Sequence, residues 1–141
     1  MKNEKVLVVE DDEVIRKVLR LQLGKWGYRV VEAEDGVAAI LKLGKEDFDL
    51  IICDIMMPKK DGWELIKEVR LSPKTKDIPV IVLTAKNKDS DMFKGYDLGA
   101  NYYITKPFTR AQLLQGIQMI LSKDPNAIGE IDLSGQYDQD S

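Results

Sequence analysis

The chain has 141 residues, of which 44% are hydrophobic and 32% are charged, and its formal net charge is −3. This length and this balance are typical of a single soluble globular domain. With one cysteine and no histidine, the chain offers no intrachain disulfide, no zinc site of Cys and His ligands, and no histidine-dependent catalytic triad. A bound metal would need oxygen ligands, which favours a hard cation such as Mg²⁺.

Charge and hydropathy along the chain predict one domain followed by a tail. Residues 122–141 carry one basic and five acidic side chains, so we expect a domain over 1–123 and an acidic tail or linker over 124–141. The remainder is near neutral, which gives no argument for direct binding to nucleic acid. We find no apolar run long enough to span a membrane and no signal peptide, and therefore expect a cytoplasmic protein with no membrane partner.

Short apolar segments alternate with longer segments of helical periodicity. A β-branched run at 6–9 is typical of a strand buried on both faces, and apolar residues recur at helical spacing over 13–25. The alternation continues with strands predicted at 28–31, 50–53, 80–83 and 102–104 and helices predicted at 36–43, 61–69, 90–98 and 110–121. We expect Gly44 to end the second helix and Thr109 to cap the last one.

Five strand–helix repeats of this kind predict a parallel sheet with helices on both faces. The expected fold class is α/β, a flavodoxin-like doubly wound five-stranded sheet with strand order 2-1-3-4-5. The carboxyl ends of its strands would share one edge, where sites form in such sheets. The residues that follow the first, third, fourth and fifth strands are Glu10-Asp11-Asp12, Asp54, Thr84 and Lys106.

The carboxylates at these strand ends predict a cation site. Two carboxylates about 4 Å apart repel by about 4 kcal/mol at an effective dielectric constant of about 20, so a cluster of them needs a proton or a cation. Beside Mg²⁺, Asp54 could attack phosphorus to form an acyl phosphate, while Thr84 and Lys106 would bind the phosphoryl oxygens. Taken one at a time, the acids at 10–12 could instead cap a helix, and the other three could be turn or surface residues.

The same segments resemble a response-regulator receiver domain, the phosphoacceptor module of two-component signalling, including chemotaxis regulators. The resemblance covers about residues 5–121. It is carried by Leu-Val-Val-Glu-Asp-Asp at 7–12, Leu-Ile-Ile-Cys-Asp-Ile-Met-Met-Pro at 50–58 with Asp61-Gly62, Val-Leu-Thr-Ala at 82–85, and Gly-Ala-Asn-Tyr-Tyr-Ile-Thr-Lys-Pro-Phe at 99–108. Each motif alone is weakly specific, but together they are very specific.

The resemblance implies a Mg²⁺ site around a phosphorylated aspartate. Asp54 would be the phosphoacceptor, Asp11 would bind Mg²⁺ directly, and Glu10 would act mainly through a metal-bound water. The metal ligands would then be Glu10, Asp11, Asp54 and the backbone carbonyl of Met56. Asp12 lies one place beyond the usual acidic pair, and the resemblance gives it no role.

The resemblance also implies a switch. Thr84 and Lys106 would bind phosphoryl oxygens, with a cis Lys106-Pro107 bond placing the ammonium. Tyr103 would turn inward as Thr84 moves, which would change the surface of the fourth helix, fifth strand and fifth helix. The phosphoryl donor would be a phosphohistidine on a sensor histidine kinase or a phosphotransfer protein, and the readout would be an output protein or domain. Apart from catalysing its own phosphorylation and dephosphorylation, the chain would not be an enzyme.

Two features depart from the family's transcription factors. Asn101 and Tyr102 stand where those proteins often carry acids, and residues 111–116 hold no charge, which argues against dimerisation through that face. Three alternatives stay open at this point: an aspartate-nucleophile phosphatase, a flavin-binding module of the same architecture, and a receiver that is one part of a multidomain regulator or hybrid kinase.

Overall fold

The computed structural model describes residues 4–55, 61–84 and 99–121, which form a parallel sheet covered on both faces. The five strands are β1 (Lys5–Val9), β2 (Arg29–Ala33), β3 (Leu50–Asp54), β4 (Val80–Thr84) and β5 (Tyr102–Thr105). Their order is β2-β1-β3-β4-β5, and all four pairings are parallel. The predicted fold class and strand order are confirmed.

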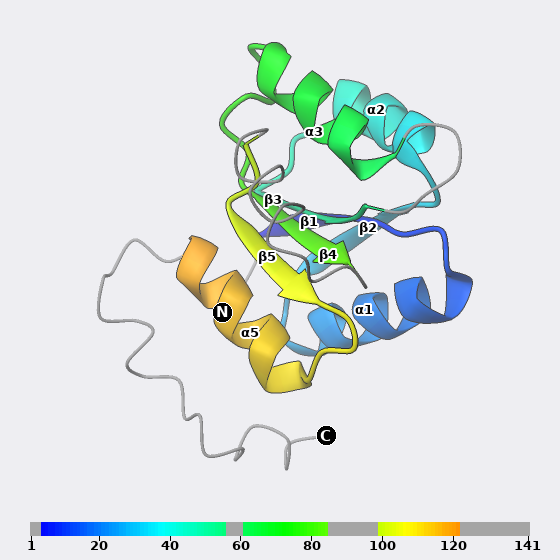
Figure 1. The fold of residues 1–141 in the computed structure, drawn as a ribbon, viewed down its shortest axis with the longest axis vertical. Helices are drawn as coiled ribbons and strands as arrows, with labels where there is room; N and C mark the ends of the chain where they lie inside the picture. Colours follow the sequence, from blue (N-terminus) through cyan, green and yellow to red (C-terminus); the bar gives the residue numbers. More distant parts are fainter. Residues whose placement is uncertain (1–3, 56–60, 85–98, 122–141) are drawn as a thin grey trace.

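Helices cover the two faces of the sheet in pairs. Figure 1 shows α2 (Gly36–Lys45) and α3 (Gly62–Leu71) above the sheet, and α1 (Glu13–Lys25) and α5 (Arg110–Leu121) below it. The helix predicted over 90–98 lies outside the described residues. Among the described residues, no helix combines the length and the apolar character needed to cross a bilayer.

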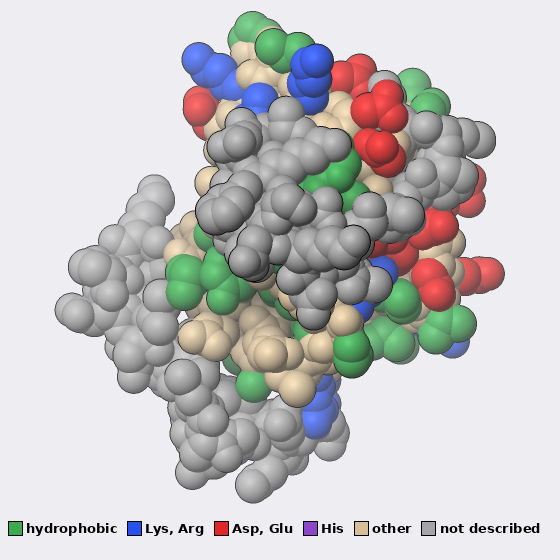
Figure 2. All heavy atoms as spheres, in the orientation of Figure 1, with side chains coloured by type: hydrophobic (Ala, Val, Ile, Leu, Met, Phe, Trp, Pro, Cys, Tyr) green, Lys and Arg blue, Asp and Glu red, His purple; other side chains and the backbone are tan. Residues whose placement is uncertain are grey.

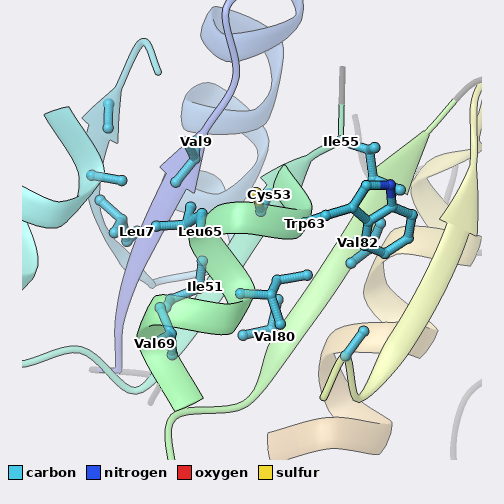
Figure 3. Packing of buried hydrophobic residues seen from close by; sticks show 14 of the residues in the cluster. Leu7, Val9, Ile51, Cys53, Ile55, Trp63, Leu65, Val69, Val80 and Val82 are labelled. Atoms are coloured by element: carbon cyan, nitrogen blue, oxygen red, sulfur yellow. The ribbon is translucent and has the colours of Figure 1, made fainter. Parts of the chain in front are cut away.

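Successive strand residues alternate between two hydrophobic cores, as the period of a β-strand requires. Leu7 and Val9 of β1 join the core under α2 and α3, while Val6 and Val8 join the core over α1 and α5. Figure 3 shows the first core, where the Trp63 ring of α3 lies beside Ile55 and Val82. Burial of both faces explains why residues 6–9, 50–53 and 80–83 of β1, β3 and β4 are continuous apolar runs.

Aspartates begin three of these helices as N-caps. The Asp12 carboxylate accepts hydrogen bonds from the amides of Val14 and Ile15 at 2.9 and 3.1 Å. Asp35 caps α2, and Asp61 caps α3 in a capping box. The capping interpretation of the acidic run is therefore confirmed for Asp12.

Several predicted boundaries differ from the observed ones by one or two residues, and two of them have a clear physical reason. α2 continues through Gly44 to Lys45 and ends where Glu46 takes an extended backbone, so Gly44 does not end the helix. β2 begins at Arg29, because Tyr28 still belongs to the turn after α1 and its amide bonds to the Leu23 carbonyl. Thr109 behaves as predicted, since its hydroxyl accepts a hydrogen bond from the Gln112 amide at 3.1 Å.

Candidate functional site

The register of the central strands brings two acids to one edge of the sheet. Val9 of β1 pairs with Cys53 of β3, so Glu10 and Asp54 follow at the same level. The Glu10 amide donates to the Ala33 carbonyl of β2 at 3.1 Å, which continues the sheet by one residue. Figure 2 shows Asp and Glu side chains (red) gathered on the right-hand side, where α1 begins in Figure 1.

Three carboxylates converge at this edge. Glu10, Asp11 and Asp54 each offer an oxygen, and these three oxygens all lie within 4.8 Å of one another. Glu10 is 0% exposed and Asp54 is 4% exposed, whereas Asp11 is open to solvent. Oxygen ligands from carboxylates, with one open side for water and phosphate oxygens, suit Mg²⁺. The residues present therefore fit the metal that the sequence predicts.

The Lys106 ammonium partly compensates this negative charge. Its Nζ lies 2.8 Å from Glu10 Oε1 and 3.5 Å from Asp54 Oδ1. Burial raises the pKa of Glu10 to about 7, with a further rise from the Asp54 charge, although the Lys106 hydrogen bond opposes the shift. Burial alone would lower the pKa of Lys106, but its contacts with both carboxylates raise the pKa overall.

The remaining predicted residues lie on or directly after the next two strands, β4 and β5. Thr84 ends β4 and is completely buried, and its carbonyl accepts a 2.7 Å hydrogen bond from the Lys106 amide. The Lys106-Pro107 peptide bond is cis. Tyr103 lies in β5, is 8% exposed and packs in the core under α2 and α3.

The structure thus brings together most of the residues that the sequence singled out. Glu10, Asp11, Asp54 and Lys106 meet at one point, with Thr84 at the neighbouring strand end. The predicted Met56 carbonyl ligand lies outside the described residues.

Two neighbours of the site were not anticipated. Arg16 donates to the Glu10 carbonyl at 2.8 Å; its only signal in the sequence is its place one turn after Asp12. The Gly62 amide donates to the Ile55 carbonyl at 3.0 Å, and a Cβ at Gly62 would lie 2.6 Å from the Asp54 carbonyl oxygen. The Asp61-Gly62 pair had been predicted to begin a helix and belongs to the motifs of the resemblance, but neither signal predicted the close approach of Gly62 to Asp54.

Comparison with known proteins decides the family. A family model described as "Response regulator receiver domain" matches residues 6–118. This chain belongs to that family. The match supports neither the phosphatase nor the flavin-binding alternative.

Curated relatives of this receiver domain are longer proteins. It is 42% identical over 124 residues to the probable transcriptional regulator ycf27 of Guillardia theta, covering 88% of this chain and 48% of that protein. It is 38% identical over 128 residues to the phosphate regulon transcriptional regulatory protein PhoB of Escherichia coli, covering 90% and 56% of the two chains. The chain therefore spans about half the length of these relatives, whose names describe transcriptional regulators.

Solved receiver structures share the whole fold. The chemotaxis protein CheY4 of Vibrio cholerae superposes with a TM-score of 0.82 at 36% identity, over 85% of this chain and 100% of that one. The receiver domain of a sensor histidine kinase from Pseudomonas aeruginosa superposes with a TM-score of 0.79 at 32% identity, over 85% and 98%. The latter structure is described as having a magnesium ion coordinated in the active site cleft. The acidic cluster of the present receiver is compatible with Mg²⁺ binding.

Proposed function

We propose that this receiver accepts a phosphoryl group on Asp54 and that Glu10, Asp11, Asp54 and the Met56 carbonyl hold the Mg²⁺ that this requires. The observation that supports the proposal is the convergence of three carboxylate oxygens within 4.8 Å beside the Lys106 ammonium. Mutual repulsion makes such a cluster a strong site for a divalent cation. When bound, Mg²⁺ would neutralise charge on the phosphoryl oxygens and orient them.

The transfer needs an acyl phosphate to form at Asp54. A carboxylate oxygen of Asp54 attacks phosphorus, the new O–P bond forms, and the P–N bond to a phosphohistidine breaks with its electron pair returning to the imidazole. The chain has no histidine, so the donor lies on a sensor histidine kinase or a phosphotransfer protein. Lys106 Nζ and the Thr84 hydroxyl each bind a phosphoryl oxygen, which balances the charge that Asp54 gains.

Phosphorylation would be read through the Thr84–Tyr103 pair. When the Thr84 hydroxyl binds the phosphoryl group, the space next to β5 changes, and the Tyr103 ring, which is already only 8% exposed in this structure, would be held in its inward position. The affected surface would be that of the predicted fourth helix, β5 and α5. Of these, β5 and α5 border a hollow of about 270 Å³ lined in part by Tyr102, Tyr103 and Gln112. An output protein or domain would bind there.

We also propose the bounds, the location and the reactions of this receiver. The domain would extend over 1–123 with 124–141 as an acidic tail or linker, in the cytoplasm and away from the membrane. Its reactions would be limited to its own phosphorylation and dephosphorylation. We propose that these 141 residues do not themselves contact nucleic acid, although the longer relatives are named as transcriptional regulators.

Incubation with acetyl phosphate and Mg²⁺, followed by intact mass measurement, tests the proposal. We expect the mass of one added phosphoryl group, lost when Mg²⁺ is chelated during the reaction. Asp54→Asn should abolish the addition, and Asp47→Asn, which changes an exposed acid before β3, should not. Phosphorylation of Asp54→Asn to the wild-type extent would overturn the assignment.

A further inference from the structure

Arg16 of α1 connects the acidic turn to the edge of the sheet. Its Nη1 donates to the Glu10 carbonyl at 2.8 Å, and its Nε donates to Glu32 Oε1 of β2 at 3.1 Å. The side chain is only 17% exposed. One planar guanidinium therefore fixes the end of β1 relative to both α1 and β2, because its donors have a rigid mutual geometry.

The turn that Arg16 holds carries the two acids of the proposed metal site. Glu10 is anchored through its amide to Ala33, and Asp12 is anchored as the cap of α1. The Asp12 amide also donates to Glu10 Oε2 at 3.1 Å. Asp11 lies between these two anchors, so the position of its carboxylate depends on how firmly the turn is held.

We propose that Arg16 is a positioning residue for Mg²⁺ binding: by holding the Glu10 carbonyl it keeps the Glu10 and Asp11 carboxylates directed toward Asp54. The inference rests on the proposed function of this site. Mutation of groups that orient metal ligands without touching the metal commonly lowers metal affinity by about 10- to 100-fold. Glu32 supports this role by accepting the second donor of Arg16.

The positive charge of Arg16 should weaken Mg²⁺ binding, whereas its proposed positioning role should strengthen it. A positive group near a cation site repels the cation, so removing Arg16 would tighten Mg²⁺ binding if charge alone mattered. If Arg16 positions the ligands, removing it weakens binding instead. The sign of the change in affinity therefore separates the two explanations.

Arg20 provides a matched control on the same helix. Its Nε lies 3.3 Å from Glu32 Oε2, so it shares a partner with Arg16 and carries the same charge. It lies one turn farther along α1, away from the acidic turn. Arg20→Ala removes one guanidinium and one ion pair but keeps the bond to the Glu10 carbonyl.

Isothermal titration of the unphosphorylated protein with Mg²⁺, at fixed pH and ionic strength, tests the inference. We expect Arg16→Ala and Arg16→Lys to weaken Mg²⁺ binding by about tenfold, because lysine keeps the charge but not the two-pronged geometry. Arg20→Ala should bind Mg²⁺ at least as tightly as the wild type. Urea unfolding without metal measures the stability of each variant, and the lysine variant carries the test if the alanine variant does not fold.

Three results would overturn the inference, and they differ in what they mean for the proposed function. If the wild type binds Mg²⁺ and Arg16→Lys binds it equally tightly, or if Arg20→Ala loses as much affinity as Arg16→Ala, then the positioning role is wrong while the proposed function stands. If the wild type itself shows no Mg²⁺ binding and gains no phosphoryl group from acetyl phosphate, the proposed function fails and the inference falls with it.

Discussion

Lys106 Nζ lies 2.8 Å from Glu10 Oε1, nearer than its 3.5 Å approach to Asp54. The ammonium thus compensates the more deeply buried of the two acids, but not completely. Burial still raises the pKa of Glu10 to about 7. Near neutral pH this carboxyl therefore holds a proton for part of the time when no metal competes for it.

We predict that metal-free stability falls as the pH rises from 5 to 7. The folded pKa of Glu10 lies above its ordinary value of 4.5, so the folded state binds the extra proton in this window and the unfolded state does not. Raising the pH removes that proton at a cost of up to about 1.4 kcal/mol per pH unit. The chain has no histidine, so Glu10 dominates the window. Urea unfolding with EDTA at several pH values measures the slope.

The slope of metal-free stability against pH should depend on Glu10 alone. Glu10→Gln should flatten the profile, whereas Glu13→Gln, which changes an exposed acid in the first turn of α1, should leave it unchanged. A wild-type stability that is constant or rises between pH 5 and 7 would contradict the raised pKa.

Gly62→Ala is predicted to damage the site from the α3 side. A Cβ at Gly62 would lie 2.6 Å from the Asp54 carbonyl oxygen and 2.7 Å from Ile55 Cα, and backbone atoms cannot move aside cheaply. We expect a loss of about 1–3 kcal/mol in the free energy of unfolding, as for other overpacked positions, together with slower phosphorylation of Asp54 by acetyl phosphate.

Gly44→Ala is the control for Gly62→Ala. Gly44 lies inside α2, and among the described residues outside that helix a Cβ there would meet no atom within 4 Å. Alanine should stabilise this helix by up to about 1 kcal/mol and leave the phosphorylation rate unchanged. Equal stability of the two variants would show that the close approach of Gly62 to Asp54 has no energetic consequence.

The architecture followed from the sequence because its signals are local and repeated. Each buried strand is a continuous apolar run, and parallel strands all end at one edge, so the sequence alone predicts that Asp54 and Lys106 lie together. The side-chain geometry within the site could not be predicted from the sequence. Lys106 lies closer to Glu10 than it does to Asp54 because of the relative positions of three strand ends. The spacing of residues along the chain does not determine those positions.

The sequence patterns also did not predict contacts between helices and loops. The bond from Arg16 to the Glu10 carbonyl follows from how α1 packs across the sheet, and arginines on an amphipathic helix usually face solvent. The ending of α2 is a similar case: the helix passes through Gly44 because glycine permits a helical backbone as readily as a turn.

Arg70 at the end of α3 is predicted to be a large contributor to stability. Its guanidinium donates to the carbonyls of Gly99, Lys76 and Ile78 and to Asn101 Oδ1, at 2.6–3.0 Å. Hydrogen bonds to charged groups contribute about 1.5–3 kcal/mol each, and carbonyls left without partners add to the loss. We expect Arg70→Ala to lower the free energy of unfolding by at least about 3 kcal/mol in urea titrations.

The control for Arg70 is Lys67→Ala, which removes an exposed cation from the same helix. Its effect should stay below about 0.5 kcal/mol. A similar loss in both variants would mean that Arg70 contributes only helix propensity and net charge.

The backbone at Gly99 has φ of 105° and a Cβ there would lie 2.8 Å from Arg70 Nε, so the same contact explains why glycine suits this position.

Cys53 should react with thiol reagents only when the protein unfolds. The side chain is completely buried beside Asp54, and burial together with the nearby negative charges raises the pKa of the thiol far above its usual range. Thiolate is the reactive form and reagents must reach it, so both conditions fail in the folded state.

Because Cys53 is the single cysteine of the chain, labelling by Ellman's reagent reports on it alone. We expect release of the coloured product to follow the urea unfolding curve, with rapid reaction in denaturant and slow reaction in buffer; fast labelling of the folded protein would show that the core beneath the phosphoacceptor opens readily.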